Sequence, residues 1–197
     1  MPPKRYAPTP LDEELCRACS DGDAAAVKKL LERGASPTCG TRVNGWSPLH
    51  YAATCADEAA AVAVIHVLER AGADVDGRSM NEATPSTRAA FKGHAKSLAA
   101  LLELGADANL HNDEGSTPLH AACAKGHAAC AALLLENGAD ATRLNSDGET
   151  PLDRARATRR GDFEGTVAVL LRARGAAAAD DELVARDRLL FANPGKT

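Results

Sequence analysis

Aromatic side chains are scarce in this sequence. Only 3% of its 197 residues are aromatic and a single one is tryptophan, although 45% are hydrophobic. Sheets favour aromatic and β-branched side chains, whereas small apolar side chains let helices approach one another closely. The composition therefore argues against a β sandwich and predicts an all-α protein.

An excess of basic residues is also missing. The chain has 23 Lys and Arg against 27 Asp and Glu, a net charge of -4, whereas nucleic-acid-binding domains usually carry a basic surface. No apolar run approaches the roughly 20 residues of a membrane span, and the N-terminal MPPKRYAPTP lacks the apolar segment of a secretory signal. We expect a protein that binds neither nucleic acid nor membranes and is cytoplasmic, with the nucleus as the alternative. Residues 1–9 are expected to be flexible.

Two short motifs recur along the chain with a period of 33 residues. The first is Ser or Thr followed by Pro, and its prolines are spaced by 37, 33 and 33 residues: SPLH 47–50, TPST 84–87, TPLH 117–120 and TPLD 150–153. The second is Gly-Ala, and its glycines are spaced by 38, 33, 33 and 37 residues: 34, 72, 105, 138 and 175. Two independent markers with a shared period indicate an internal repeat.

Each motif has a structural role. A Ser or Thr hydroxyl caps the first free N–H groups of a helix, and Pro at the first helical position has no N–H to leave unpaired. A glycine after a leucine-rich stretch, as in CAALLLENG 130–138, ends a second helix because it readily adopts the left-handed conformation. Lys-Gly-His at 125–127 lies between the two helices, and polar turns such as HNDEGS 111–116 precede the first. Each repeat is therefore predicted to be a turn, a helix, a reversal and a helix.

The stretch STPLHAACAKGH at 116–127 is similar to the signature of ankyrin repeats. The resemblance implies an all-α ankyrin-repeat solenoid of about five helix-turn-helix units with hairpin loops, spanning residues 10–177. We place the units at about 10–40, 41–76, 77–109, 110–142 and 143–177. Because the ends of a solenoid need polar caps, residues 178–192 are expected to form a capping helix, or alternatively a peptide that docks a partner, followed by a tail at 193–197.

Some units depart from the common pattern. The 41–76 and 143–177 units contain four extra residues, which we expect to lengthen the segment between their two helices. The 77–109 unit has Glu82 where the turn usually has glycine, and Ser86-Thr87 in place of Leu-His. We expect these changes to distort its hairpin.

The histidines and cysteines invite a catalytic or metal-binding interpretation, but their positions favour a structural one. His50 and His120 occupy the fourth position of the Ser/Thr-Pro motif, where imidazole usually bonds to nearby backbone, and ligands strung along a solenoid cannot converge on one ion. Cys16 and Cys19 form a CxxC, but within an amphipathic helix whose buried face would carry both sulfurs. We therefore expect no enzyme activity, no cofactor and no metal, with a metal-binding or redox protein as a remote alternative.

The resemblance implies that the hairpin tips and the exposed side of the first helices bind a protein partner. Residues that vary at matching offsets are the candidates. They are Trp46, Met80, Asn81, Asp113, Glu114, Ser116, Asp147 and Glu149 on the hairpins, and Tyr51, Arg88, Phe91, Lys92, Lys125 and Arg154 on the helices. Trp46 is either a binding hot spot or local core packed on the preceding hairpin.

The sequence thus predicts a monomeric scaffold or adaptor that binds a protein partner on this concave face. A regulatory subunit that occludes the site of a partner enzyme is the alternative. The resemblance also implies that Asn109, with Leu101 eight residues earlier, is a candidate substrate of an asparaginyl hydroxylase.

Overall fold

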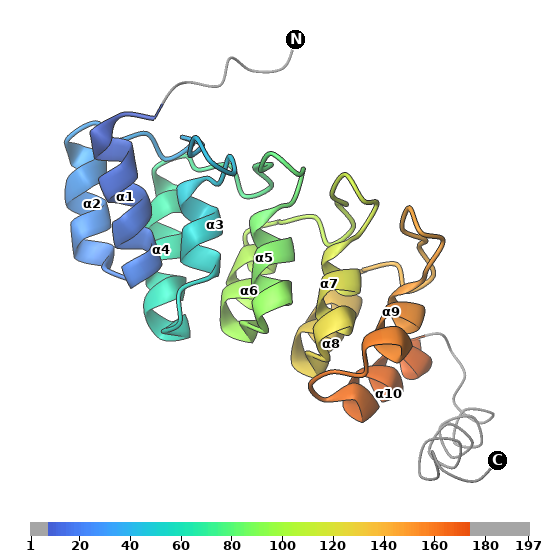
Figure 1. Ribbon diagram of the computed structural model, residues 1–197. Coiled ribbons are helices and arrows are strands. Elements are labelled where there is room, and N and C mark those ends of the chain that lie inside the picture. The colour runs from blue at the N-terminus through green and yellow to red at the C-terminus, as the bar shows by residue number, and fades with distance from the viewer. Residues whose placement is uncertain (1–7, 174–197) are drawn as a thin grey trace, which may run out of the picture.

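The computed structural model describes residues 8–173, which form ten α-helices and no strands, arranged as five antiparallel pairs in a row (Figure 1). The helices are α1 Pro10–Asp21, α2 Ala24–Glu32, α3 Pro48–Ala53, α4 Glu58–Arg70, α5 Pro85–Lys92, α6 Ala95–Glu103, α7 Pro118–Lys125, α8 Ala128–Glu136, α9 Pro151–Thr158 and α10 Phe163–Ala173. The predicted capping helix at 178–192, the tail at 193–197 and residues 1–7 of the predicted flexible segment lie outside the described residues. None of the ten helices is long and apolar enough to cross a bilayer.

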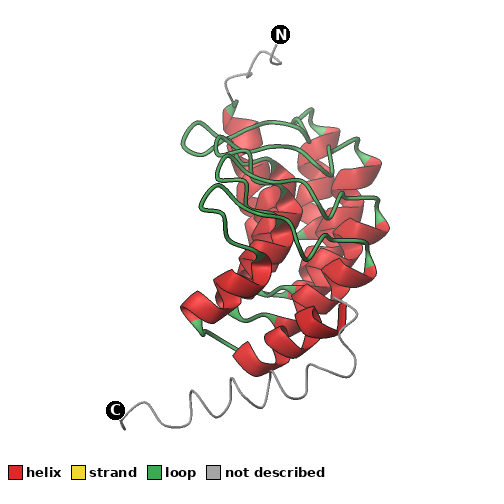
Figure 2. Ribbon diagram, turned by 90° about the vertical axis from the view of Figure 1, so that its right-hand side faces the viewer, coloured by secondary structure: helices red, strands yellow, loops and turns green. Residues whose placement is uncertain are grey.

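The odd-numbered helices form one layer and the even-numbered helices form a second layer behind it. Each helix contacts its partner in the pair and the corresponding helices of the neighbouring pairs, as α5 contacts α3, α6 and α7. Figure 2 shows the two layers, with the loops projecting from one end of the helices. This arrangement confirms the predicted all-α solenoid, in which each pair buries its apolar face against its neighbours.

The first helix of every pair begins as the sequence predicts. A Ser or Thr is the N-cap and a Pro follows at the first helical position in α1, α3, α5, α7 and α9. The leucines that follow the proline, Leu49, Leu119 and Leu152, are buried in one continuous core with the leucines of the second helices. The same local signal therefore starts the first helix of each pair, and in α3, α7 and α9 it is followed by a leucine that is buried in the stack.

Backbone hydrogen bonds join neighbouring hairpins at a repeated register. In each bond an amide of one hairpin donates to a carbonyl of the preceding one: Met80 to Asn44 at 2.9 Å, Asp113 to Asn81 at 3.2 Å and Ser146 to Glu114 at 2.9 Å. These bonds fix the spacing of the hairpin tips along the stack.

The extra residues of the 41–76 unit do not lengthen mainly the connection between its helices, as the sequence had suggested. The connection grows from two residues, between α5 and α6, to four, while the second helix grows from nine residues in α6 to 13 in α4. The alanine-rich segment propagates a helix readily, and Ala61, Val64, Ile65 and Leu68 bury one face of it. The added turn is therefore stabilised by packing.

The predicted distortion of the hairpin in the 77–109 unit is wrong. Glu82 has a φ of 59°, close to the 68°, 70° and 75° of Gly45, Gly115 and Gly148 at the matching positions. The amide of Ser79 donates to the carbonyl of Ala83 at 3.0 Å, the same distance as in the other hairpins. Glu82 thus adopts the left-handed conformation that usually requires glycine, because the bonds on either side of it hold the turn.

Candidate protein-binding face

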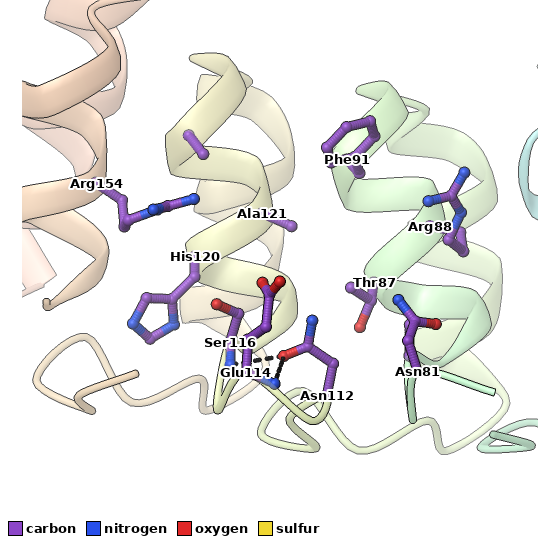
Figure 3. A pocket seen from close by; sticks show the side chains of 12 residues that line it. Asn81, Thr87, Arg88, Phe91, Asn112, Glu114, Ser116, His120, Ala121 and Arg154 are labelled. Atoms are coloured by element: carbon purple, nitrogen blue, oxygen red, sulfur yellow. Dashed lines mark hydrogen bonds between the residues drawn. The ribbon is translucent and has the colours of Figure 1, made fainter. Parts of the chain in front are cut away.

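The hairpin tips and the odd-numbered helices form one surface, which we call the inner face. It comprises the exposed sides of α3, α5, α7 and α9 with the hairpins at 41–47, 78–84, 111–117 and 144–150. A cavity of about 200 Å³ lies on this face between α5 and α7, and its lining comes from both the helices and the hairpins (Figure 3). The inner face therefore contains a recess as well as an exposed surface.

The two histidines of the Ser/Thr-Pro motif tie α3 and α7 to the hairpin of the next repeat. The Nδ1 atom of His50 lies 2.8 Å from the Ser47 hydroxyl, and its Nε2 atom lies 2.9 Å from the carbonyl oxygen of Ala83. His120 repeats this geometry with Thr117 and with the carbonyl of Glu149, at 2.9 and 3.1 Å. Burial lowers the pKa of His50 to about 4 and lowers that of His120, so both rings are neutral near pH 7 and act structurally, as predicted.

Thr87 occupies the same position in α5 but cannot make this tie. Its hydroxyl lies 3.1 Å from that of Thr84, within its own helix start, and threonine is too short to reach the next hairpin as an imidazole does. Thr87 and Ser116 both line the cavity, and Ala121 and Ala124 contribute small side chains from α7. The loss of one histidine thus coincides with the recess.

A row of aromatic and cationic side chains runs along the inner face from α3 to α7. We call it the cation–aromatic row, and it consists of Tyr51, Trp46, Arg88, Phe91 and Lys125. The rings of Trp46 and Tyr51 meet edge-on, with their centres 5.2 Å apart. The guanidinium carbon of Arg88 lies 4.2 Å from the centre of the Trp46 ring. Arg88 and Lys125 lie 5.4 and 4.3 Å from the centre of Phe91. Cations therefore alternate with rings across three neighbouring repeats.

Arg88 differs electrostatically from two nearby arginines, Arg78 and Arg154. No carboxylate within residues 8–173 forms an ion pair with it, whereas Arg154 pairs with Glu149 at 3.1 Å and Arg78 with Glu82 at 3.3 Å. The Nε atom of Arg88 is buried and makes no hydrogen bond to any described residue. Burial lowers the pKa of its guanidinium, and no described carboxylate pairs with the group to offset this effect.

The structure brings most of the predicted binding residues together. Six of them line the cavity: Asn81, Arg88, Phe91, Glu114, Ser116 and Arg154. Tyr51, Trp46 and Lys125 belong to the cation–aromatic row, and Glu149 pairs with Arg154. The remaining candidates lie exposed outside these two features: Met80, Lys92, Asp113 and Asp147.

Trp46 packs toward the following repeat, and its role as a binding hot spot stays a prediction. Its ring stacks on His50 of its own helix at 6.2 Å and is covered by Arg88 of the following helix, and it remains half-buried. It therefore packs toward the next repeat, and it keeps part of its surface available for contact.

Sequence reasoning did not select Thr87, Asn112, Ala121 and Ala124, although they line the cavity. Asn112 orients the hairpin, since its side-chain oxygen accepts from the amides of Glu114 and Ser116 at 3.1 and 2.9 Å. Comparison of matching offsets contains the missing signal, because Ala121 stands one period from both Arg88 and Arg154. A small residue between two large ones predicts a recess.

The features considered for metal or redox chemistry lie away from this face or serve the core. Cys16 and Cys19 are buried in α1 as predicted, and burial raises the pKa of the Cys19 thiol, which leaves it protonated and unreactive. Among the described residues no group of three or more His, Cys, Asp or Glu side chains is arranged to hold a metal ion.

Asn109 lies in the connection between successive repeats and is held on both sides of its amide. Its Nδ2 atom donates to the carbonyl of Gly138 at 2.9 Å, and its Oδ1 atom accepts from the amide of Asp140 at 2.8 Å. Hydroxylation of Asn109 stays a prediction, and any modifying enzyme would have to open these bonds.

A stack of helical pairs with a continuous face of hairpins and first helices defines a helical repeat protein built for recognition. Ankyrin repeats (3 copies) match residues 15–112 and again residues 87–180, so the chain belongs to the ankyrin-repeat family. Ankyrin repeats are generally binding modules without catalytic activity of their own.

Parts of the chain are also similar to a much longer enzyme. The 2-5A-dependent ribonuclease of Mus musculus is 38% identical over 74 residues, which is 38% of this chain and 10% of that protein. The human 2-5A-dependent ribonuclease is 37% identical over 82 residues, 42% of this chain and 10% of the enzyme. The chain thus matches only a tenth of either relative's length.

Proposed function

We propose that this protein is a scaffold or adaptor of the cytoplasm or nucleus that binds a protein partner through its inner face. The observation that carries the proposal is the cation–aromatic row, in which Trp, Tyr, Phe and Arg side chains line one continuous surface. Trp, Tyr and Arg are enriched in binding hot spots. The rigid rings of Trp and Tyr also offer a large contact area with little loss of conformational entropy. The adjoining cavity supplies a recess into which a partner's side chain can insert.

Affinity purification with quantitative mass spectrometry tests this proposal. Phe91→Ala is a suitable variant because Phe91 is 37% exposed, so its removal should change binding more than folding. Arg70→Gln, an exposed cation at the end of α4 in the other layer, is the control. At least one protein should be recovered with the wild type and the control but not with Phe91→Ala. Equal recovery of every co-purified protein by all three would contradict the proposal.

A regulatory role is the first alternative, since the same face could occlude the active site of a partner enzyme. The two roles differ in what happens to the partner's activity. Adding the purified chain to the recovered partner should leave its activity unchanged for a scaffold. A stoichiometric loss of activity that Phe91→Ala abolishes would identify an inhibitor.

A nucleotide ligand is a second candidate, favoured by the ring faces of Trp46 and Phe91 beside cations. The name of the two relatives says that the ribonuclease depends on 2-5A. Because Trp46 is the only tryptophan of the chain, its fluorescence reports directly on this region. Titration with 2-5A should leave the emission unchanged if the inner face is a protein-binding surface, whereas a saturable change would favour binding of 2-5A.

A further inference from the structure

We propose that the partner segment recognised by the inner face is acidic, and that one of its carboxylates binds Arg88 at the cavity between α5 and α7. This inference rests on the proposed function, since it names the chemistry of the partner at the same surface. Arg88 is half-buried, its Nε atom makes no hydrogen bond to a described residue, and no described carboxylate pairs with it. A partly desolvated guanidinium is best stabilised by a carboxylate that accepts two hydrogen bonds from its planar edge.

The charges around the cavity favour a single carboxylate. Arg88, Lys125 and Arg154 supply three positive charges, and Glu114 and Glu149 supply two negative ones. Because Glu149 already pairs with Arg154 at 3.1 Å, the two positive charges of Arg88 and Lys125 outnumber the one remaining negative charge of Glu114. One additional carboxylate balances this set of charges.

The hairpin tips argue against a polyanion such as a phosphorylated segment or a nucleic acid strand. Asp113, Glu114 and Asp147 lie along the rim of the inner face, and all three are exposed. A chain of phosphates laid on the helices would run beside these carboxylates and be repelled. The same rim favours a partner that places basic or neutral residues over the hairpins and acidic residues over the helices.

The surfaces beside Arg88 determine which partner residues can flank the carboxylate. Phe91 and Trp46 present ring faces on the two sides of the guanidinium, at 5.4 and 4.2 Å. Ala121 and Ala124 leave room over α7, where larger side chains would fill the cavity. The expected recognition element is therefore an Asp or Glu flanked by apolar side chains, which pack on the rings and over the alanines.

Selection of random linear peptides displayed on phage against the full 197-residue chain tests this inference. The selected peptides should be enriched in Asp and Glu next to apolar residues relative to the unselected library. Binding of the purified peptides should weaken when salt is raised, because the contact between Arg88 and the carboxylate remains partly accessible to solvent.

The variants separate this contact from folding. Arg88→Gln should weaken the selected peptides by about tenfold or more, and Arg88→Lys by less, since lysine keeps the charge but loses the planar edge. Thr87→His, which should place a ring in the cavity, should weaken them as well. Arg70→Gln keeps the net charge of Arg88→Gln but lies in the other layer, and should bind as the wild type does.

The outcomes distinguish failure of this inference from failure of the proposed function. Peptides that lose binding with Phe91→Ala but are neutral or basic, or are unaffected by Arg88→Gln, would overturn the acidic partner while leaving the inner face as a binding surface. Selected peptides that require phosphorylation to bind would overturn it as well. Recovery only of peptides insensitive to Phe91→Ala, or of none, would count against both.

Discussion

The imidazole Nε2 atom of His50 lies 2.9 Å from the carbonyl oxygen of Ala83, 33 residues further along the chain. The ring is fully buried, and its other nitrogen faces the hydroxyl of Ser47, the N-cap residue of the same helix. One neutral side chain therefore joins a helix start to the hairpin of the next repeat. Its protonation would remove the acceptor at Nδ1 and leave a buried charge.

Stability is expected to fall as the pH is lowered from about 7 to about 5. Burial lowers the folded-state pKa of His50 from 6.5 to about 4, so below pH 6.5 the unfolded chain takes up a proton that the folded chain does not. The free energy of unfolding should decrease by about 2 kcal/mol over this range from His50 alone, and His120 acts in the same direction. Urea denaturation at several pH values measures the effect. His50→Gln should be less stable than the wild type at pH 7, and the gap should narrow at pH 5; a constant gap would contradict this account.

Glu82→Gly is expected to stabilise the protein by about 1 kcal/mol, because Glu82 holds a φ of 59° that glycine adopts without steric cost. The exposed pair with Arg78, at 3.3 Å, contributes little that would be lost. Glu82→Ala is the matched control, since it removes the same pair but keeps the Cβ atom. Thermal or urea denaturation should show a gain for glycine only. Equal gains for both variants would mean that the carboxylate, not the backbone, is the source of strain.

Thr87→His is expected to create the tie that α3 and α7 possess. The new ring should reach the carbonyl of Ser116 as His50 reaches that of Ala83, and should add about 1 kcal/mol to the free energy of unfolding. Denaturation with urea measures the change. Thr87→Ala, which loses the bond to Thr84 without gaining the ring, should be destabilised. A histidine variant no more stable than the alanine variant would show that the cavity is not shaped for the missing side chain.

Leu119→Ala is expected to cost about 2–5 kcal/mol, because Leu119 is fully buried between neighbouring pairs and leaves a cavity when truncated. Phe91→Ala, on the inner face, should change stability far less. Circular dichroism during denaturation provides the comparison. A loss for Phe91→Ala as large as that for Leu119→Ala would make Phe91 part of the core and would disqualify it as a variant for testing binding.

The sequence was sufficient to predict the fold because the same local signals recur in successive repeats. N-cap residues, prolines and terminal glycines define the helix ends locally. The 33-residue period indicates which helix faces of neighbouring repeats pack together. It failed where long-range packing outweighs a local signal. The bonds around the hairpin hold Glu82 in the left-handed region, and burial of Ile65 and Leu68 extends α4.

The candidate site was foreseen only in part for a similar reason. Exposed positions such as Arg88 and Phe91 can be selected by their offset in the repeat. The cavity instead depends on the small side chains of Thr87 and Ala121, at positions where some other repeats have larger ones. The orientation of Trp46 depends on Arg88, 42 residues away in the chain, and no local pattern encodes that contact.

The hairpin bonds also make the length of this protein adjustable in steps of one period. Ser146 donates to Glu114 as Asp113 donates to Asn81, so excising residues 110–142 would bring Ser146 opposite Asn81 with its donor and acceptor still matched. A shortened chain could therefore re-form a continuous stack, and evolution could add or remove whole segments without redesigning the joints. What such an excision would change is the pattern of side chains displayed, since Lys125 would leave the row.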